Sequence, residues 1–534
     1  MPGVKTERNG SGSRFDLARA AAGALSGLLA GFAALAVAEL LSAAVRPEAG
    51  PVVAVGGAAI DRTPASVKDW AIREFGTDDK LVLQSGIVVV LALLALALGL
   101  VALRHRRIGA AGVLLFGVVG ALAAVSRPDA SGPVDALPSL VGAVAGAALL
   151  YGLAGRLAQV PEGVAGDAEA GGWDRRGFLV ATTAAAAASA GVGALGRSFN
   201  ASRGKDAIAS RDGIVLPAPA SPASAVPRGA RLRVPGISPF VTSSKDFYRV
   251  DTALVVPKVD ADAWRLRIHG KGVARETTVS FQDLLRRELV ERDITLTCVS
   301  NEVGGPYVGN ARWIGVRLAD VLAECGVEPP ARGGPADQLV ARSVDGMTIG
   351  TPVDDVMDGR DALLALGMNG EPLPFEHGFP VRMVVPGLYG YVSACKWIED
   401  IELTTFDAYD PYWVRRDWAA KAPVKTQSRI DTPKPFARPK AGTVMVAGVA
   451  WAQHRGIDKV EVRVDDGPWR TADLAAEDTR DTWRQWSFPW QAAPGGHTLT
   501  VRATDRTGAV QTAERTRTIP DGASGRHSVV ITVI

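Results

Sequence analysis

The residue best suited to redox-metal chemistry is Cys298, which closes an apolar run that begins near Asp293. The run predicts a buried strand, and the Gly-Gly pair that follows predicts a tight turn. A thiolate at the end of such a strand could bind a soft metal, with backbone amides close by. A lone cysteine on a strand is more often a packing residue, so Cys298 alone supports only a hypothesis.

A second stretch places three cationic side chains next to turns. His377 and Arg382 are five residues apart around a Gly-Phe-Pro turn, and Lys396 follows another glycine-rich turn. Converging His, Arg and Lys side chains suit an anionic ligand such as a phosphate. The same spacing also fits charges on solvated loops, and this stretch alone leaves that alternative open.

Short strands and helices between residues 236 and 428 must position these side chains. Strands are predicted at Trp264–His269, Asp293–Val299, Val381–Val385 and Ile398–Leu403. Val316–Cys325 has helical spacing and ends at a glycine. From 429 to 534, short runs separated by Gly and Asp turns predict strands only. The fold class is therefore α+β, with a C-terminal immunoglobulin-like β-sandwich.

The order of several motifs resembles the sulfite oxidase family of molybdopterin-dependent oxidoreductases. These motifs are Cys-Val-Ser-Asn from 298, Asn-Ala-Arg-Trp-Ile-Gly-Val from 310, Met-Asn-Gly-Glu-Pro-Leu-Pro from 368, His-Gly-Phe-Pro-Val-Arg from 377, Val-Pro-Gly from 385 and Lys-Trp from 396. The family also includes assimilatory nitrate reductases and bacterial methionine sulfoxide reductases. The resemblance covers about 235–534. It implies a molybdopterin-binding domain at 236–428 and a dimerisation-type sandwich at 429–534, which allows for a homodimer.

The resemblance also implies a cofactor, Mo-molybdopterin, with Cys298 supplying a thiolate to molybdenum. It places the pterin and its phosphate among Lys245, Tyr248, Arg249, Asp345, His377, Arg382, Ala394, Cys395 and Lys396. The implied reaction transfers an oxygen atom to or from a small sulfur-containing or related substrate, and an external carrier exchanges the electrons. Cys325 has no matching role and is expected in the core.

One position departs from the family pattern. Sulfite oxidases carry an active-site tyrosine after an Arg-Arg-Asp stretch, and here Trp418 follows that stretch. An indole has no hydroxyl; it offers one N–H donor and a large apolar face. Trp418 is thus a candidate catalytic residue that favours a less charged or organic substrate, and Arg312 is a candidate for binding a substrate anion. Two reactions stay open: oxidation of sulfite or another sulfur oxyanion, and reduction of a sulfoxide.

Residues 1–197 predict a membrane region with about five helices, because a span needs about 20 apolar residues. The stretches are Leu17–Val45, Leu81–Leu103, Ile108–Val125, Leu137–Leu157 and the milder Phe178–Gly196. Lys and Arg cluster before the first stretch, between the second and third, and after the fourth. This bias predicts a cytoplasmic N-terminus and a catalytic part outside a bacterial plasma membrane.

The connection before the fifth stretch contains Arg175 and Arg176, followed by Gly-Phe-Leu and an alanine-rich run. This pattern resembles a twin-arginine export signal, whose pathway carries folded proteins. The ordinary alternative is a positive flank beside a membrane helix. Residues 198–235 predict a linker from their Pro, Ala, Ser and Arg content. His105 is the only histidine near the spans, so we expect an anchor or docking surface rather than a cytochrome.

Composition argues against several other classes of protein. A formal net charge of +3 over 534 residues gives no argument for nucleic acid. The three cysteines have the spacing of neither a disulfide framework nor a zinc ribbon, and the sequence contains no CxxCH haem motif. The alternative from another class is a cofactor-free surface binding protein with an immunoglobulin-like domain. A binding module has no need of Cys298 together with the His/Arg/Lys set.

Overall fold

The computed structural model describes residues 11–64, 67, 70–71, 74–75, 79–158 and 175–534. The chain divides into two compact units. One contains the N-terminal helices up to residue 205 together with residues 252–255, and the other contains residues 206–251 and 256–534.

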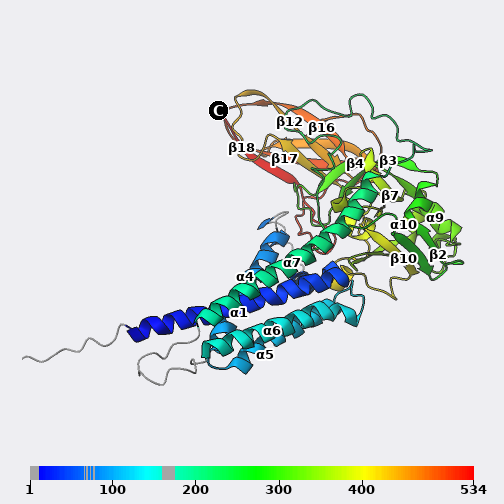
Figure 1. Cartoon of the computed structure of the whole chain (residues 1–534). Helices are drawn as coiled ribbons and strands as arrows, with labels where there is room; N and C mark the ends of the chain where they lie inside the picture. Colours follow the sequence, from blue (N-terminus) through cyan, green and yellow to red (C-terminus); the bar gives the residue numbers. More distant parts are fainter. Residues whose placement is uncertain (1–10, 65–66, 68–69, 72–73, 76–78, 159–174) are drawn as a thin grey trace, which may run out of the picture. The chain divides into compact units, whose positions relative to one another are not determined.

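Five helices among the described residues are long and apolar enough to cross a membrane. They are α1 (Ser11–Ala44), α4 (Asp79–Ala102), α5 (Arg106–Val125), α6 (Leu137–Ala158) and α7 (Arg175–Asp212), coloured blue to green in Figure 1. A shorter helix, α2 (Pro51–Arg62), lies in the first connection. Helices of spanning length thus occur at all five expected stretches, whereas the orientation in a membrane stays a prediction.

Glycine contacts bring α1 and α4 together. A methyl group on Gly27 would lie 1.9 Å from the carbonyl oxygen of Ala95, and one on Gly99 would lie 2.2 Å from that of Gly23. Small residues at a crossing let two backbones approach closely, which matters where lipid removes the hydrophobic drive for helix association. The backbones of α1 and α4 therefore pack directly against each other.

The expected linker at 198–235 differs from the structure. Helix α7 continues to Asp212, and Arg211 in its last turn donates to the carbonyl oxygens of Leu373 and Pro372 at 2.8 and 2.9 Å. Ile214 and Leu216 then pack against the core of the second unit. The prediction of a loose linker was wrong here, because composition cannot reveal that these few apolar side chains find a partner surface.

Two sheets form the centre of the second unit. One has the strand order β2-β1-β10-β5-β6, and the other has β3-β4-β7-β8 with β9 paired to β7. Their bounds are β1 (Arg265–Gly270), β2 (Thr277–Ser280), β3 (Val290–Thr297), β4 (Val308–Arg317), β5 (Gln338–Ser343), β6 (Thr348–Pro352), β7 (Leu363–Met368), β8 (Glu371–Pro372), β9 (Arg382–Val384) and β10 (Ile398–Thr404).

Short helices connect these strands. They are α8 (Phe281–Leu285), α9 (Leu318–Glu324), α10 (Val353–Met357) and α11 (Gly390–Ser393). The helix predicted at Val316–Cys325 is present as the shorter α9, because Val316 and Arg317 still belong to β4. Mixed sheets with short helices confirm the α+β expectation for this region.

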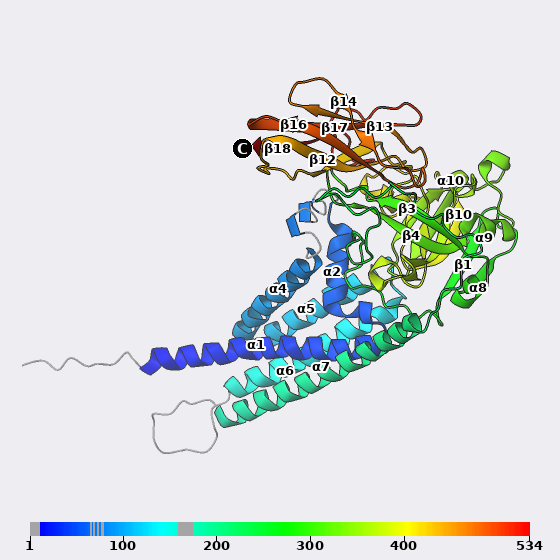
Figure 2. The same cartoon turned by 90° about the horizontal axis from the view of Figure 1, so that it is seen from above.

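The C-terminal residues form two further sheets of four antiparallel strands, β11-β12-β16-β15 and β14-β13-β17-β18 (Figure 2). The strands are β11 (Gln427–Thr432), β12 (Gly442–Trp451), β13 (Ile457–Val464), β14 (Arg470–Thr471), β15 (Asp473–Leu474), β16 (Arg484–Ala492), β17 (Gly495–Asp505) and β18 (His527–Val533). Alternate side chains of both sheets, such as Val446, Trp486, Val462 and Ile531, share one buried core. Residues 427–533 are therefore a two-sheet sandwich.

Candidate functional site

Cys298 directly follows β3, and the loop behind it is tied back to the strand end. The Cys298 N–H donates to the Tyr307 carbonyl at 3.0 Å, and the Asn301 N–H donates to the Cys298 carbonyl at 3.1 Å. The Asn301 side chain then accepts from the Tyr307 N–H at 2.8 Å. The Cys298 side chain is 8 % exposed, and none of the three cysteines is in a disulfide. The thiol is thus held in a fixed and nearly closed position.

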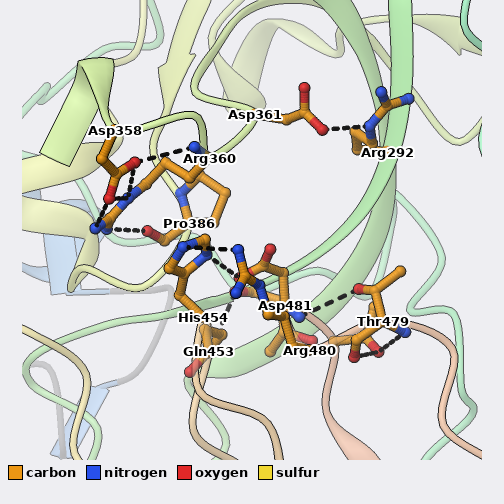
Figure 3. Close-up of polar contacts among 12 residues, drawn as sticks. Arg292, Asp358, Arg360, Asp361, Pro386, Gln453, His454, Thr479, Arg480 and Asp481 are labelled. Carbon is orange, nitrogen blue, oxygen red and sulfur yellow. Dashed lines mark hydrogen bonds and ion pairs between the residues drawn. The ribbon is translucent and has the colours of Figure 1, made fainter.

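The sandwich helps to hold the strand that leads to Cys298. Buried Gln453 donates to the Thr295 carbonyl at 3.0 Å and to the Thr297 hydroxyl at 2.9 Å. The next residue, His454, lies between Asp481 and Arg480, at 3.2 and 3.1 Å (Figure 3). These contacts connect the turn after β12 with β3, so the sandwich contributes to positioning the thiol.

The three predicted cations converge on one glycine. A methyl group on Gly378 would lie 3.0 Å from Cβ of Arg382 and 3.1 Å from Cβ of Lys396. Gly378 has φ +109°, which other residues rarely adopt, and it ends the 3-10 turn Phe375–His377. The His377, Arg382 and Lys396 side chains are 2, 5 and 8 % exposed as whole residues. The alternative of solvated loop charges is therefore wrong for this set.

Arg382 and Lys396 make this buried cluster electropositive, and not all of its donors are bonded. Burial lowers the pKa of His377 to about 4, assisted by the charges of Arg382 and Lys396. It also lowers the pKa of Arg382 to about 10. Arg382 donates from Nη1 to the His377 carbonyl at 3.1 Å, whereas its buried Nε has no hydrogen-bond partner in the described part of the chain. An unmet donor of this kind costs about 1–3 kcal/mol, which an anionic ligand would offset.

Asp251 is a member of this cluster that sequence reasoning missed. Its Oδ2 accepts from Lys396 Nζ at 2.7 Å and from Arg249 Nε at 2.9 Å. Lys396 also donates to the Glu376 carbonyl at 3.0 Å. The carboxylate thus joins two of the predicted cofactor-binding residues. The only signal in the sequence is an acidic residue two positions after Arg249, which is too common to be specific.

Aromatic rings connect the two parts of the site. Phe247 contacts His377 and Trp313 with ring centroids 5.6 and 5.8 Å apart, and it stacks on Tyr248 at 5.1 Å. The Arg382 guanidinium lies 5.0 Å from the Trp313 ring centroid. Phe247 and Trp313 therefore form the wall behind the cationic cluster.

Cys298 and Arg382 act in opposite directions on the pKa of Tyr248. Burial and the Cys298 thiol raise the pKa of Tyr248 above its usual range, while the Arg382 charge acts in the opposite direction. The Tyr248 ring also lies 6.3 Å from that of Tyr307, whose carbonyl holds the Cys298 N–H. Both the thiol and the guanidinium are thus within electrostatic reach of one phenol.

The remaining predicted cofactor residues lie at the edges of this site. Burial, and next the Asp345 charge, raise the pKa of the fully buried Cys395 thiol above its usual range. Ala394 is half-buried and directly follows α11. Asp345 lies in the β5–β6 turn, and Lys245 is exposed. Burial thus favours the protonated thiol of Cys395, and none of the described contacts joins the exposed Lys245 to the cationic cluster.

Trp418 is buried beside α11 and contacts the ring of Tyr391 in that helix. Its centroid lies 5.5 Å from that of Tyr391 in α11 and 6.2 Å from that of Trp413. Its indole N–H has no hydrogen-bond partner among the residues that the structure describes. A methyl group on Gly390, the first residue of α11, would lie 4.0 Å from the Tyr248 hydroxyl. Trp418 is therefore separated from Tyr248 by one turn of α11.

Arg312 is not part of the site, which corrects the prediction of a substrate-binding role. It pairs with Asp293 across β3 and β4, at 2.9 Å from Nε and 2.6 Å from Nη2. Successive residues of a strand point to opposite faces, so Arg312 faces away from its neighbour Trp313, which contacts Arg382. Nη2 also donates to the Ser224 carbonyl at 3.2 Å, and Nη1 lies 3.8 Å from the Glu291 carboxylate. No substrate anion is therefore needed to satisfy this guanidinium group.

Comparison with known proteins agrees with this geometry. Residues 253–413 match the oxidoreductase molybdopterin binding domain. The chain is 31 % identical to mitochondrial sulfite oxidase of Homo sapiens over 291 residues, which are 46 % of this chain and 53 % of that protein. It is also 33 % identical to the uncharacterized oxidoreductase YuiH of Bacillus subtilis over 159 residues, which are 30 % of this chain and 74 % of that protein.

The chain belongs to the sulfite oxidase family. This membership confirms the expected enzyme class, an oxidoreductase, and implies Mo-molybdopterin as its cofactor. The chain spans about half the length of the animal sulfite oxidases, 53 % in the human case. Among solved structures, it is similar to the sulfane dehydrogenase SoxCD from Paracoccus pantotrophus, with 24 % identity, a TM-score of 0.47, and coverage of 55 % of this chain and 83 % of that one.

The residues of this sulfite oxidase family member fit such a cofactor. A buried cluster of His377, Arg382 and Lys396 with an unmet guanidinium donor suits a phosphate. Within the described ranges, no three His, Cys, Asp or Glu side chains gather as a metal site of their own.

Proposed function

We propose that this protein is a membrane-anchored molybdenum enzyme that transfers an oxygen atom to or from a small sulfur-containing or related substrate. The observation that carries the proposal is the buried convergence of Arg382 and Lys396 at Gly378, beside the Phe247 ring on which Tyr248 stacks. A cofactor-free protein gains nothing from burying these cations with an unmet donor, because such burial costs stability.

Each side chain has a proposed role in this arrangement. Cys298 would supply the thiolate to molybdenum, as a soft ligand suited to that metal. His377, Arg382 and Lys396 would hold the phosphate, while Tyr248 and Arg249 would bind the pterin. When bound, the cofactor supplies oxygen-atom transfer chemistry; the protein orients it and excludes water. The neutral His377 donates or accepts without adding a charge, since its pKa is about 4.

The cellular setting is part of the proposal. The five apolar helices anchor the chain in a bacterial plasma membrane, and the Lys/Arg bias places the catalytic unit outside. Electrons then pass to an external carrier, because the described helices offer only His105 as a haem ligand. The sandwich is of the immunoglobulin-like, dimerisation type. The proposed twin-arginine pair begins at Arg175, the first described residue after the gap at 159–174.

A second candidate reaction is sulfoxide reduction, and Trp418 favours it. A buried indole packed on Tyr391 offers an apolar surface where a sulfite oxidase would have a phenol. An apolar wall favours an organic substrate over a dianion. Both reactions use the same cofactor site, so they differ only in the substrate and in the direction of electron flow.

Metal analysis and turnover of the purified full-length protein test the proposal. We expect about one molybdenum atom per chain, with sulfite-dependent reduction of an artificial acceptor or sulfoxide-dependent oxidation of an artificial donor. Cys298→Ser should remove turnover in both directions. A folded protein without molybdenum, even when produced in a host that makes the cofactor, would instead support the cofactor-free binding protein.

A further inference from the structure

Three arginines surround one tryptophan on the outer face of the sandwich. The guanidinium carbons of Arg502, Arg463 and Arg526 lie 4.3, 5.1 and 5.1 Å from the ring centroid of Trp469. A cation over an indole face is attracted by the ring, but three cations on one ring also repel one another. The three arginines therefore concentrate positive charge in a small area.

Strand register explains why these side chains meet. On β13, Val460 and Val462 face the core, so Glu461 and Arg463 face outward. Glu461 pairs with Arg502 of β17, and Arg463 pairs with Thr500 of the same strand. The strands that carry these residues, β13, β17 and β18, are neighbours in one sheet (Figure 2).

The third strand completes the two rows. Thr500 pairs with Ser528 of β18, and their hydroxyl oxygens lie 2.8 Å apart. Arg526 directly precedes β18, two residues before Ser528. Arg463, Thr500 and Ser528 thus form one row of outward side chains across the sheet. Arg502 and Arg526 lie in the neighbouring row. Guanidinium groups and hydroxyls, all of them potential donors, face the same patch.

The carboxylate at this patch, Glu461, is already paired with other cations. Glu461 accepts from Arg502 at 2.8 Å and lies 3.4 Å from Lys459. In the described part of the chain, the buried Nε atoms of Arg463 and Arg526 have no hydrogen-bond partner. Burial, and next the charges of Arg502 and Arg463, lower the pKa of Arg526. Among the described residues, neither guanidinium group forms an ion pair, and the Glu461 charge acts on the pKa of Arg526 only as a smaller, opposing cause.

We propose that this patch is a binding site for a tetrahedral oxyanion, a phosphate or sulfate group. Arg463 and Arg526 clamp the anion, one hydroxyl of the bonded Thr500–Ser528 pair donates its remaining hydrogen to it, and Trp469 keeps the guanidinium groups in place. Planar guanidinium groups bind such anions through paired N–H donors, which matches the unmet Nε atoms. The group belongs either to a free ion or to the headgroup of an acidic lipid. The site is on the sandwich and does not depend on the reaction proposed for the Cys298 site.

Calorimetric titration of the full-length protein in detergent, at constant ionic strength, tests the site. The probes are inorganic phosphate and inorganic sulfate, with the double variant Arg463→Gln/Arg526→Gln against the wild type. We expect the double variant to bind at least about tenfold more weakly, because two charged clamps are lost. The matched control is Arg470→Gln, which removes an exposed arginine next to Trp469 and should leave the affinity within about twofold.

A second arm separates the two sources of the group. A short-chain phosphatidylglycerol that binds more tightly than phosphate, while phosphatidylcholine does not bind, identifies a lipid headgroup. Phosphate and sulfate binding without this preference identifies a free ion. The double variant should also keep or raise its thermal midpoint in phosphate-free buffer, since like charges are removed. Absence of binding to every probe, or equal weakening in Arg470→Gln, would overturn the proposal.

Discussion

Lys396 and Asp251 form a buried ion pair in which Nζ lies 2.7 Å from Oδ2, and their side chains are 10 and 3 % exposed. Arg249 shares the same oxygen at 2.9 Å. One carboxylate therefore contacts two of the cations proposed to bind the cofactor, and it offsets only one of their charges. Since no carboxylate among the described residues forms an ion pair with Arg382, the cluster keeps a net positive charge. Asp251 thus orients the site without neutralising it.

Asp251→Asn should reduce cofactor loading. The change removes the counter-charge of buried Lys396 and of the partly exposed Arg249, and breaking a buried pair such as Lys396–Asp251 costs about 3–5 kcal/mol. We expect a lower thermal midpoint and a molybdenum content well below that of the wild type, measured by elemental analysis. Asp246→Asn, at an exposed residue that accepts from Ser243, serves as the control and should load normally. Full loading of Asp251→Asn would contradict the positioning role.

Cys298→Ser should abolish turnover while the protein stays folded. A hydroxyl is similar in size to a thiol, but it does not supply the soft thiolate that molybdenum needs. Cys325 is buried in the core of the second unit, at 2 % exposure, and directly follows α9. Cys325→Ser should therefore be nearly silent in steady-state kinetics. Comparable activity of both variants would remove Cys298 as the metal ligand.

His527 makes stability depend on pH. Burial, and next the Arg429 charge, lower its pKa to about 4, and its Nδ1 accepts from the Ile430 N–H at 3.0 Å. The unfolded chain binds a proton below its ordinary pKa of 6.5, whereas the folded chain does not until about pH 4. Unfolding thus becomes easier as the pH falls through this window, by up to about 3 kcal/mol.

His527→Asn keeps an acceptor for Ile430 and removes the titration. The fall in thermal midpoint between pH 7 and pH 4 should therefore be smaller in this variant than in the wild type. His497→Asn is the control: Asp465 raises the pKa of this more exposed histidine, so its effect has the opposite sign and is small. Parallel pH profiles for the wild type and His527→Asn would show that His527 is already charged in the fold.

Trp418→Tyr should alter substrate selectivity. The indole has an unmet N–H and packs on Tyr391, so a phenol would bring a hydroxyl and free some volume there. We expect the wild type to turn over sulfite poorly and the variant to gain sulfite turnover relative to sulfoxide. Steady-state kinetics with sulfite and with a sulfoxide as substrate tests this change in selectivity. Efficient sulfite turnover by the wild type, unchanged in the variant, would make the substitution immaterial.

The topology prediction concerns the chain ends. With the N-terminus inside and five spans, a reporter fused after Ile534 should behave as an extracytoplasmic protein. Replacing Arg175 and Arg176 with Lys should hold the folded catalytic part in the cytoplasm, because the export machinery reads the arginine pair. A cytoplasmic signal from the wild-type fusion would exclude the five-span arrangement, and normal export of the Lys variant would favour an ordinary positive flank.

The sequence by itself determined the elements whose signal is local. Each apolar stretch predicted as a span is a long helix, because helical length and hydropathy need no partner to be visible. The strand before Cys298 and the alternating strands of the sandwich were likewise predictable from short runs and turns. The ordered motifs carried the family resemblance, since each one combines residue types that chance seldom repeats in that order.

Only the tertiary structure decided which side chains face one another. Arg312 and Trp313 are adjacent in the sequence, yet one pairs with Asp293 and the other contacts Arg382 on the opposite face. Asp251 and Lys396 are 145 residues apart and share a hydrogen bond. No local pattern encodes such partners, because the register of paired strands and the packing of loops set them. That is why the sequence suggested His377, Arg382 and Lys396 as a set, whereas the Lys396–Asp251 and Arg312–Asp293 pairs came only from the structure.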